Sequence, residues 1–342
     1  MADRTLRNGR ALNAAGLIAA GRVEEADSVA RRYAVAVTPQ IAKLIEPEAA
    51  DDPVARQYLP DARELTHTPE ERDDPIGDDA HSPLPGLVHR YPDRVLLMPT
   101  TACPVYCRFC FRRERVGHGA TAMTAGEIDD ALAYIADRPA IREAILTGGD
   151  PMILSPRRLG DILRRVAAIE TVEVLRIHSR VPVADPGRID GSTVAALRQR
   201  VPVYVAIHCN HPREIDREAA RAIAALADAG VPLLAQTVLL KGVNDDADTL
   251  EALFRALVRH RVRPYYLHHP DLAPGTAHFR LSIEEGQALV RALRGRISGL
   301  CQPTYVIDIP GGHGKVPVGP SFRGENGALV DWQGSVHRGP TG

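Results

Sequence analysis

From residue 94 onward, short apolar runs alternate with longer segments whose apolar residues recur every three or four positions. Runs that are apolar throughout are typical of strands buried on both faces, whereas the longer spacing predicts amphipathic helices. The runs predict strands at 94–98, 144–146, 172–178, 201–208, 231–238, 263–268 and 305–309. This alternation indicates about seven β–α units in a parallel sheet covered by helices, either doubly wound or closed into a barrel.

Local signals mark several helix ends within this pattern. Thr124 with Glu127, and Ser282 with Glu285, have the spacing of capping boxes and predict two helix N-termini. Gly230 follows a helical stretch and predicts its C-terminus, because glycine readily adopts the left-handed conformation found there.

The first part of the chain follows a different pattern. Residues 1 to about 50 carry helical spacing, and residues 51–85 are rich in Asp, Pro and Glu, which predicts an extended, irregular arm. A loop of this length usually packs on something. We therefore expect a helical N-terminal region and arm at 1–88, an α/β core at 89–310 and a C-terminal segment at 311–342.

Three of the five cysteines lie within eight residues, directly after the first predicted strand, as Cys103, Cys107 and Cys110. A structural zinc site normally has four ligands in two pairs, and Cys209 and Cys301 stand alone. Three thiolates can instead hold an iron–sulfur cube and leave one iron open to a reacting molecule. The alternatives are an incomplete zinc site or three small buried apolar residues.

Two glycine-containing segments are further candidates for chemistry. Gly148, Gly149 and Asp150 follow a predicted strand and could hold an amino group with carbonyl and carboxylate oxygens, although Gly-Gly-Asp is also an ordinary turn. Lys315 follows a run of glycines and could react with an aldehyde cofactor. By itself, this second segment could equally be a phosphate-binding loop or a flexible turn.

The candidate residues share one position in the pattern. In barrels and other parallel α/β sheets, active groups gather at the carboxyl ends of the strands. The residues at or just past a predicted strand end are Cys103 to Cys110, Gly148 to Asp150, Ser179, His208, Gln236, Asp271 and Lys315.

Composition limits the partners and the compartment. The 42 basic and 43 acidic residues nearly balance, so no overall basic charge favours nucleic acid or a membrane surface. The mildly apolar stretch at 11–20 is interrupted by Asn13 and Gly16, so we expect neither a signal peptide nor a membrane span. Few, clustered cysteines favour a reducing compartment, which predicts a cytoplasmic protein.

The cysteine spacing, with Phe109 before the last cysteine, resembles the radical S-adenosylmethionine (SAM) superfamily, and the chain from about 76 to 317 resembles the lysine 2,3-aminomutase family. The matching segments are 85–97, 146–151, 176–180, 208–212, 265–266, 271–272, 278–280, 308–317 and the cysteine loop with Arg112 and Arg113. The resemblance implies a partial (β/α)6 barrel at 89–310, preceded by the helical region and followed by a short segment with a lysine for pyridoxal 5'-phosphate (PLP). The implied cofactors are a 4Fe–4S cluster, SAM and PLP.

The resemblance also assigns roles to individual residues. It implies that Cys103, Cys107 and Cys110 hold the cluster and that Lys315 carries PLP. Around PLP it places Arg90, Tyr91, Arg94 and His208. For SAM it suggests Gly148, Gly149, Asp150, Ser179 and Gln236. For the substrate it suggests Arg112 at the α-carboxylate and Asp271 with Asp308 at the far end. Without the resemblance, each of these charged residues could be an ordinary surface or turn residue.

The implied activity is an isomerase reaction that moves the α-amino group of free L-lysine from C2 to C3 and gives β-lysine. A pair of aspartates suits an ε-ammonium group and would repel glutamate, whereas arginine stays possible. The implied partner is an electron donor such as flavodoxin or ferredoxin, and a homo-oligomer is possible. The chain length resembles the branch that modifies a lysine of elongation factor P, which is the alternative function. A radical SAM protein that only binds or assembles is a further one.

Overall fold

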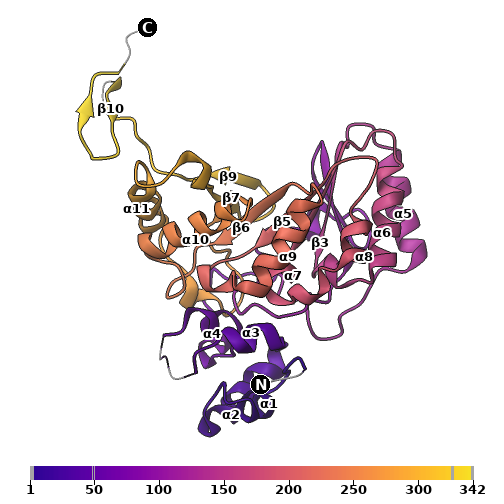
Figure 1. The fold of residues 1–342 in the computed structure, drawn as a ribbon, viewed down its shortest axis with the longest axis horizontal. Coiled ribbons are helices and arrows are strands. Elements are labelled where there is room, and N and C mark those ends of the chain that lie inside the picture. The colour runs from indigo at the N-terminus through magenta and orange to yellow at the C-terminus, as the bar shows by residue number, and fades with distance from the viewer. Residues whose placement is uncertain (1–3, 48, 50, 325–326, 340–342) are drawn as a thin grey trace.

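Nine strands follow one another in chain order across a single sheet in the computed structural model, which describes residues 4–47, 49, 51–324 and 327–339 (Figure 1). The seven predicted strands are all present and pair in parallel with their sequence neighbours. They are β2 (Arg94–Thr100), β3 (Glu143–Gly148), β4 (Val174–Ser179), β5 (Val203–His208), β6 (Leu233–Val238), β7 (Arg263–His268) and β8 (Thr304–Ile309).

Six helical crossovers connect these seven strands and cover the outer face of the sheet (Figure 1). Both predicted capping boxes form, Thr124 with Glu127 and Ser282 with Glu285, and Gly230 has the positive φ expected after a helix. The crossover helices are α5 (Ala125–Ala136), α6 (Pro156–Ala167), α7 (Val181–Ala184), α8 (Gly191–Ala196), α9 (Arg217–Asp228), α10 (Ala247–Arg259) and α11 (Ile283–Leu293). The predicted (β/α)6 arrangement is therefore confirmed.

Two antiparallel strands that the pattern does not predict complete the sheet. They are β1 (Leu87–Tyr91), which pairs with β2, and β9 (Gly314–Pro317), which pairs with β8. These two outermost strands meet, because the backbone nitrogen of Lys315 donates a hydrogen bond of 2.7 Å to Oη of Tyr91. The sheet thus nearly closes into a barrel, and residues from its first and last strands lie side by side.

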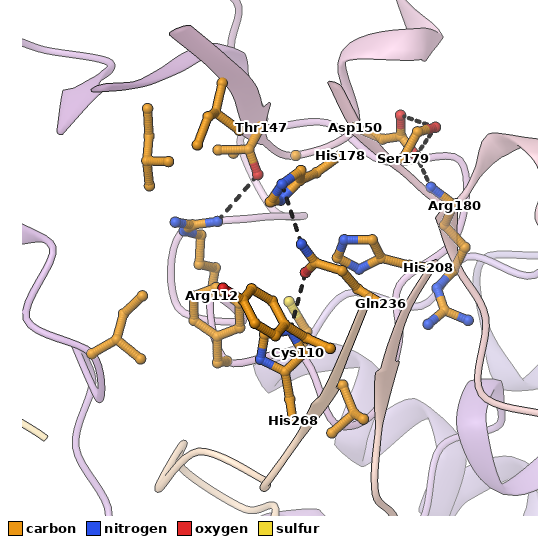
Figure 2. Close-up of a pocket in the computed structure, with 18 of the residues that line it drawn as sticks. Cys110, Arg112, Thr147, Asp150, His178, Ser179, Arg180, His208, Gln236 and His268 are labelled. Carbon is orange, nitrogen blue, oxygen red and sulfur yellow. Dashed lines mark hydrogen bonds between the residues drawn. The ribbon is translucent and has the colours of Figure 1, made fainter. Parts of the chain in front are cut away.

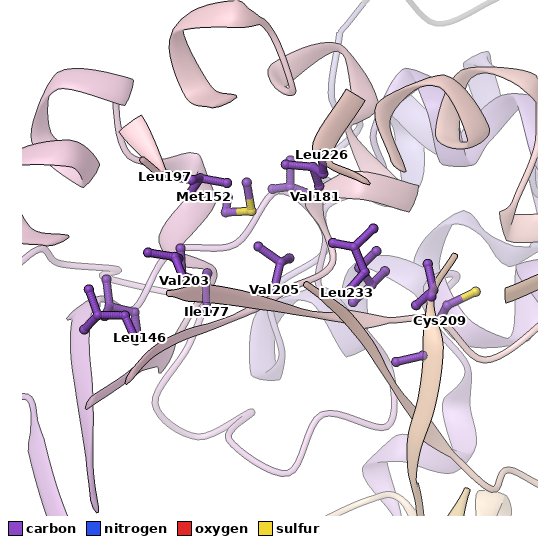
Figure 3. Packing of buried hydrophobic residues seen from close by; sticks show 14 of the residues in the cluster. Leu146, Met152, Ile177, Val181, Leu197, Val203, Val205, Cys209, Leu226 and Leu233 are labelled. Atoms are coloured by element: carbon purple, nitrogen blue, oxygen red, sulfur yellow. The ribbon is translucent and has the colours of Figure 1, made fainter. Parts of the chain in front are cut away.

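The main core lies between the sheet and its crossover helices. Figure 3 shows Leu146, Val203 and Val205 from the strands packed against Leu226 and Leu197 from the helical layer. Complete burial of one such side chain contributes about 1.5–3 kcal/mol to the free energy of folding. The apolar layer therefore holds each strand in a fixed position, and with it the strand's carboxyl end. The strand ends in turn position the residues that follow them.

The N-terminal helices form a separate group beside the barrel (Figure 1), and this region has its own apolar cluster. Its helices are α1 (Gly9–Ala14), α2 (Val23–Arg32), α3 (Pro39–Leu44) and α4 (Pro53–Tyr58). The cluster includes Val105 of the cysteine loop and Ala184 of α7. The N-terminal region therefore packs directly against the segment that carries the three clustered cysteines.

The prediction of an irregular arm at 51–85 is wrong at its beginning, where α4 forms. Asp52 accepts hydrogen bonds from the backbone nitrogens of Val54 and Ala55, and Pro53 occupies the first helical turn, where it is tolerated. The arm continues through the 3-10 turn η2 (Ala62–Leu65) and packs on the barrel mouth, for example through the hydrogen bond from Arg72 nitrogen to Leu272 oxygen.

The C-terminal segment leaves the barrel after β9 and ends in a hairpin of β10 (Leu329–Val330) and β11 (Val336–His337), whose turn residue Trp332 lies against Gly295 after α11 (Figure 1). None of the helices in the described ranges has the length and apolar character that crossing a bilayer requires.

Candidate active site

A cavity of about 580 Å³ opens at the carboxyl ends of the barrel strands. This volume is within the usual range for small-molecule sites. All sixteen residues that the sequence and its family resemblance assign to chemistry line it, including Cys103, Cys107, Cys110, Asp308 and Lys315. The tertiary structure therefore brings the cysteine loop and the C-terminal lysine into one chamber, although about 200 residues separate them in the chain.

Residues of the N-terminal region hold the cysteine loop in place through ion pairs and a backbone hydrogen bond. The buried carboxylate of Glu64 pairs with Arg108, whose Nε lies 3.0 Å from it, and with Arg113. The backbone nitrogen of Arg108 also donates to Gln57 oxygen at 2.8 Å. These contacts fix the loop on both sides of Cys110.

The three thiols suit a cluster better than a single metal ion. Burial raises the pKa of all three, that of Cys107 to about 11, so a bound cation would be needed to stabilise the thiolates. Within the described residues, no three His, Cys, Asp or Glu side chains converge on one metal position. A 4Fe–4S cube takes each thiolate on a different iron, so it can be held by three thiols that line one cavity without meeting at a single point.

Gly148 and Gly149 allow the cysteine loop to approach the end of β3. Gly148 has φ +104°, and a Cβ at Gly149 would lie 2.2 Å from Ala102 oxygen. Asp150 follows, and its buried carboxylate accepts hydrogen bonds from Ser179 Oγ at 2.8 Å and from Arg180 nitrogen at 2.7 Å (Figure 2). Asp150 and Ser179 therefore join the ends of β3 and β4, and burial raises the pKa of Asp150.

A chain of hydrogen bonds crosses the cavity floor from β4 to β9. Gln236 lies 3.3 Å from Nε2 of His178 through its amide nitrogen and 3.1 Å from Nε2 of His268 through its oxygen (Figure 2). Because the amide oxygen only accepts, Nε2 of His268 carries the proton, and its Nδ1 presents a lone pair to Lys315 Nζ at 3.3 Å. Burial lowers the pKa of both histidines well below 6.5, so both are neutral.

Lys315 lies between this chain of hydrogen bonds and two aspartates, Asp271 and Asp308. Its Nζ pairs with the Asp308 carboxylate and lies 5.7 Å from the centre of the Tyr266 ring. Burial and the neighbouring Asp308 raise the pKa of Asp271 to about 7. The acidic end of the cavity can therefore hold a proton or accept a second cation near neutral pH.

Arginines form a cationic part of the cavity lining that borders the acidic end, because Nη1 of Arg90 lies 3.9 Å from Oδ1 of Asp308. Arg94 stacks on the Tyr91 ring with its guanidinium carbon 3.8 Å from the ring centre. Arg90 and Arg112 both pair with the buried carboxylate of Asp78. The buried nitrogens at the cavity that have no hydrogen-bond partner among the described residues include Arg90 Nε and His208 Nε2. Burial lowers the pKa of His208 to about 3, so it faces the cavity as a neutral ring.

Sequence reasoning did not single out four residues that the structure places in or beside the site. His178 and His268 belong to the chain through Gln236, Asp78 holds two arginines, and Arg180 joins Glu214 and Tyr58 at the cavity edge. His178 and Arg180 do lie in the segment 176–180 that carries the resemblance, directly after a predicted strand. Nothing in the sequence marked Asp78 as a site residue, because the acidic segment around it has the composition of a solvent-exposed loop.

The fold and the site together indicate the class of enzyme, and two family models match the chain. Residues 97–253 match the family model described as "Radical SAM superfamily", and residues 290–326 match that described as "Lysine-2,3-aminomutase". Enzymes of this kind use a 4Fe–4S cluster and SAM, and the aminomutases also use PLP. These groups fit the residues present. The half-buried thiols of the cysteine loop suit the cluster, and Lys315 with the unpaired nitrogens of Arg90 and His208 suits PLP.

The chain belongs to the lysine 2,3-aminomutase family. It is 45% identical over 288 residues to the L-lysine 2,3-aminomutase of Acetoanaerobium sticklandii, which covers 84% of this chain and 70% of that protein. The Clostridium subterminale enzyme of the same name is 44% identical, covering 87% and 73%. A glutamate 2,3-aminomutase of Clostridioides difficile is 35% identical, covering 90% and 74%. Among solved structures, a radical SAM methyltransferase from Sphaerobacter thermophilus matches with TM-score 0.47 and 21% identity over 65% of this chain and 68% of that one.

Proposed function

We propose that this chain is a radical SAM, PLP-dependent aminomutase that converts L-lysine to β-lysine by moving its α-amino group from C2 to C3. One observation carries the proposal: the three clustered cysteines and Lys315 line the same cavity, together with arginines and two aspartates. Both requirements of the reaction, a source of radicals and a lysine that can hold an aldehyde cofactor, are thereby within reach of one substrate.

Within this proposal, Cys103, Cys107 and Cys110 would hold the cluster, which with SAM would supply the radical chemistry. Gly148 and Gly149 contribute main-chain oxygens for the amino group of SAM, because the Asp150 carboxylate already accepts hydrogen bonds from Ser179 and Arg180. Ser179 and Asp150 then support this end of the cavity, and Gln236 supports the middle through its two histidine partners.

PLP would be held by Lys315 and by a group of residues on β1, β2 and β5. Arg90 and Arg94 offer cationic donors for its phosphate, Tyr91 offers an aromatic face, and His208 offers a buried nitrogen without a partner in the described structure. When bound, PLP spreads the unpaired electron during migration. Tyr91 also fixes the backbone of Lys315 through its hydroxyl, so the amine enters the cavity at a defined place.

The substrate lies between two charged ends. Arg112 presents a planar guanidinium, which suits two carboxylate oxygens, and Asp271 with Asp308 suits an ammonium group at the other end. Glutamate would place its side-chain carboxylate against these aspartates, which like-charge repulsion disfavours. Free lysine therefore fits both charged ends.

The reaction also needs an electron donor of the flavodoxin or ferredoxin type to reduce the cluster. The three clustered cysteines are free thiols, and cluster assembly requires that they stay reduced. We therefore also propose a cytoplasmic location.

The proposal is tested with reconstituted enzyme supplied with dithionite, SAM and PLP and then offered lysine, arginine, glutamate or elongation factor P. The expected result is a β-amino product from free lysine. Product only from elongation factor P would replace the proposed substrate, and no product from any of them would favour a binding role.

Lys315→Ala is the matched variant. We expect it to keep its iron content and its SAM binding but to lose lysine turnover, because the cofactor lysine is gone. Iron analysis, SAM equilibrium dialysis and product chromatography measure the three quantities. Full turnover in this variant would remove the assigned role, and Lys241→Ala, on the exposed surface, is the control expected to act like the parent.

A further inference from the structure

Asp78 is a buried carboxylate at the cavity wall that comes from outside the barrel. It lies in the arm between η2 and β1 and is only 1% exposed. Buried carboxylates are rare unless they are paired, and Asp78 is paired twice. Its Oδ1 lies 3.0 Å from Nη2 of Arg90, and its Oδ2 lies 3.0 Å from Nε and 2.9 Å from Nη2 of Arg112.

The geometry at Arg112 separates the two edges of its guanidinium. Asp78 occupies the edge formed by Nε and Nη2, and the remaining nitrogen, Nη1, lies 3.5 Å from Thr147 Oγ1 at the cavity wall (Figure 2). A guanidinium can bind carboxylates along either edge. Asp78 thus takes the edge away from Thr147, and the edge that contains Nη1 has the long hydrogen bond of 3.5 Å to Thr147 Oγ1 but no carboxylate partner among the described residues.

Asp78 is itself held firmly, so it can serve as a fixed reference point. Its backbone nitrogen donates to Asp74 Oδ1 at 2.9 Å, and its backbone oxygen accepts from Ser82 Oγ at 2.8 Å. The preceding Gly77 has φ +69°, and a Cβ there would lie 2.4 Å from Gly312 nitrogen. The arm is therefore pressed against the glycine turn that leads to Lys315.

We propose that Asp78 is a positioning residue that aims the free edge of Arg112 at the α-carboxylate of the substrate and keeps Arg112 in register with Arg90. This inference rests on the proposed function, because it takes Arg112 as the group that binds this carboxylate. Asp78 contacts both arginines with one oxygen each, so it sets the distance between the substrate side and the cofactor side of the cationic part of the cavity lining.

Charge supports the same role. Asp78 is the counter-charge that lies against Arg112, whereas Arg90 also pairs with Asp308 at 3.9 Å. Although burial disfavours the charged form, Arg112 and Arg90 hold the pKa of Asp78 below its usual value. An amide at this position would place an N–H group or a neutral oxygen against the guanidinium donors, and Arg112 would lose its fixed orientation.

The test compares the binding of lysine with that of cadaverine, which is lysine without its carboxylate. Dissociation constants are measured by equilibrium dialysis on reconstituted enzyme without reductant, so that no turnover occurs. We expect Asp78→Asn to weaken lysine binding about tenfold, the effect of losing one charge-assisted hydrogen bond, and to change cadaverine binding less than about twofold.

Asp79→Asn is the matched control, because it makes the same change one residue further along at a side chain that is 74% exposed. We expect its ratio of lysine to cadaverine affinity to equal that of the parent. If Asp78→Asn does not fold, Asp78→Glu replaces it, since the longer side chain keeps the charge but displaces Arg112, and the ratio is again expected to fall.

The outcomes separate this inference from the proposed function. If the parent enzyme does not bind lysine more tightly than cadaverine, the α-carboxylate role of Arg112 fails and the proposed function loses its substrate orientation. If the parent discriminates between the two and a folded Asp78 variant keeps the same ratio, the positioning role of Asp78 is overturned while the proposed function stands.

Discussion

At the scale of single residues, the cavity is dominated by ionisable groups whose neighbours decide their charge. Asp271 and Asp308 lie close together, and burial together with their mutual repulsion raises the pKa of Asp271 to about 7. The buried histidines His178 and His268 stay neutral, because no carboxylate compensates the cost of burying their charge. The acidic end is thus the part of the site that titrates near neutral pH.

We predict that lysine binding strengthens as pH rises from about 6 to about 8. Asp271 is protonated in roughly nine of ten free molecules at the lower pH and ionised in roughly nine of ten at the higher one, which gives an affinity gain approaching tenfold. Lysine affinity measured by equilibrium dialysis at several pH values tests this. In Asp271→Asn the gain should vanish; an equal pH dependence in both proteins would contradict the assignment.

Asp271 also makes the stability of the folded protein depend on pH, in a direction that follows from its raised pKa. The folded pKa of Asp271, about 7, lies above its ordinary value of 3.8, so the folded chain retains a proton that the unfolded chain has lost between these values. Its contribution to stability is therefore complete below about pH 4 and is lost as pH rises through 7. Substitution by Asn should remove this part of the pH dependence of unfolding.

At the scale of elements, the cysteine loop shows how a segment without regular structure is held. Glu64 of η2 is fully buried and pairs with Arg108 and Arg113, which flank Cys110. Arg113 also stacks on the Tyr33 ring, with its guanidinium carbon 3.5 Å from the ring centre. The loop therefore depends on ion pairs with the N-terminal region for its position.

We predict that Glu64→Gln destabilises the protein by about 3–5 kcal/mol and lowers its iron content, because it leaves two buried arginines without a counter-charge. Urea unfolding and iron analysis after reconstitution measure the two effects. Glu70→Gln, at an exposed carboxylate of the same arm that lies 3.6 Å from Arg280, is the control and should show no measurable change. Normal iron content and stability in Glu64→Gln would show that the loop holds its position unaided.

At the scale of the whole molecule, the N-terminal region and the barrel share polar as well as apolar contacts. Tyr58 of α4 donates to Glu214 at 2.9 Å, and its hydroxyl accepts from Arg180, which follows β4, at 2.7 Å. Arg180 and Glu214 also pair directly at 2.9 Å. Since all three side chains are buried, separating the two parts would expose an ion pair and an apolar cluster together.

We therefore predict that the two parts unfold in one transition and that Tyr58→Phe shifts it without splitting it. The expected loss is about 1–3 kcal/mol, because Arg180 and Glu214 each lose a hydrogen-bond partner inside the protein. Circular dichroism and the visible absorbance of the cluster should report the same midpoint in urea. Two separate midpoints, in the parent or in the variant, would contradict this.

The sequence by itself determined the order of the strands and the identity of the chemical groups. Apolar runs buried on both faces predicted the seven parallel strands to within a few residues, because such runs leave little alternative, and the capping boxes placed two helix starts correctly. The spacing of the cysteines identified the cluster candidates, and the resemblance assigned the cofactor lysine. These are local signals, carried by residues near one another in the chain.

Only the tertiary structure decided which distant residues meet. The short antiparallel strands β1 and β9 have few apolar residues of their own and form because the barrel offers them an edge to pair with. The helix at 53–58 was missed because its Asp-Pro start lies in an acidic stretch that is equally typical of irregular chain. Asp78 shows the same limit. Its carboxylate belongs to the site because folding buries it between Arg90 and Arg112, and the spacing of these residues in the sequence does not predict that contact.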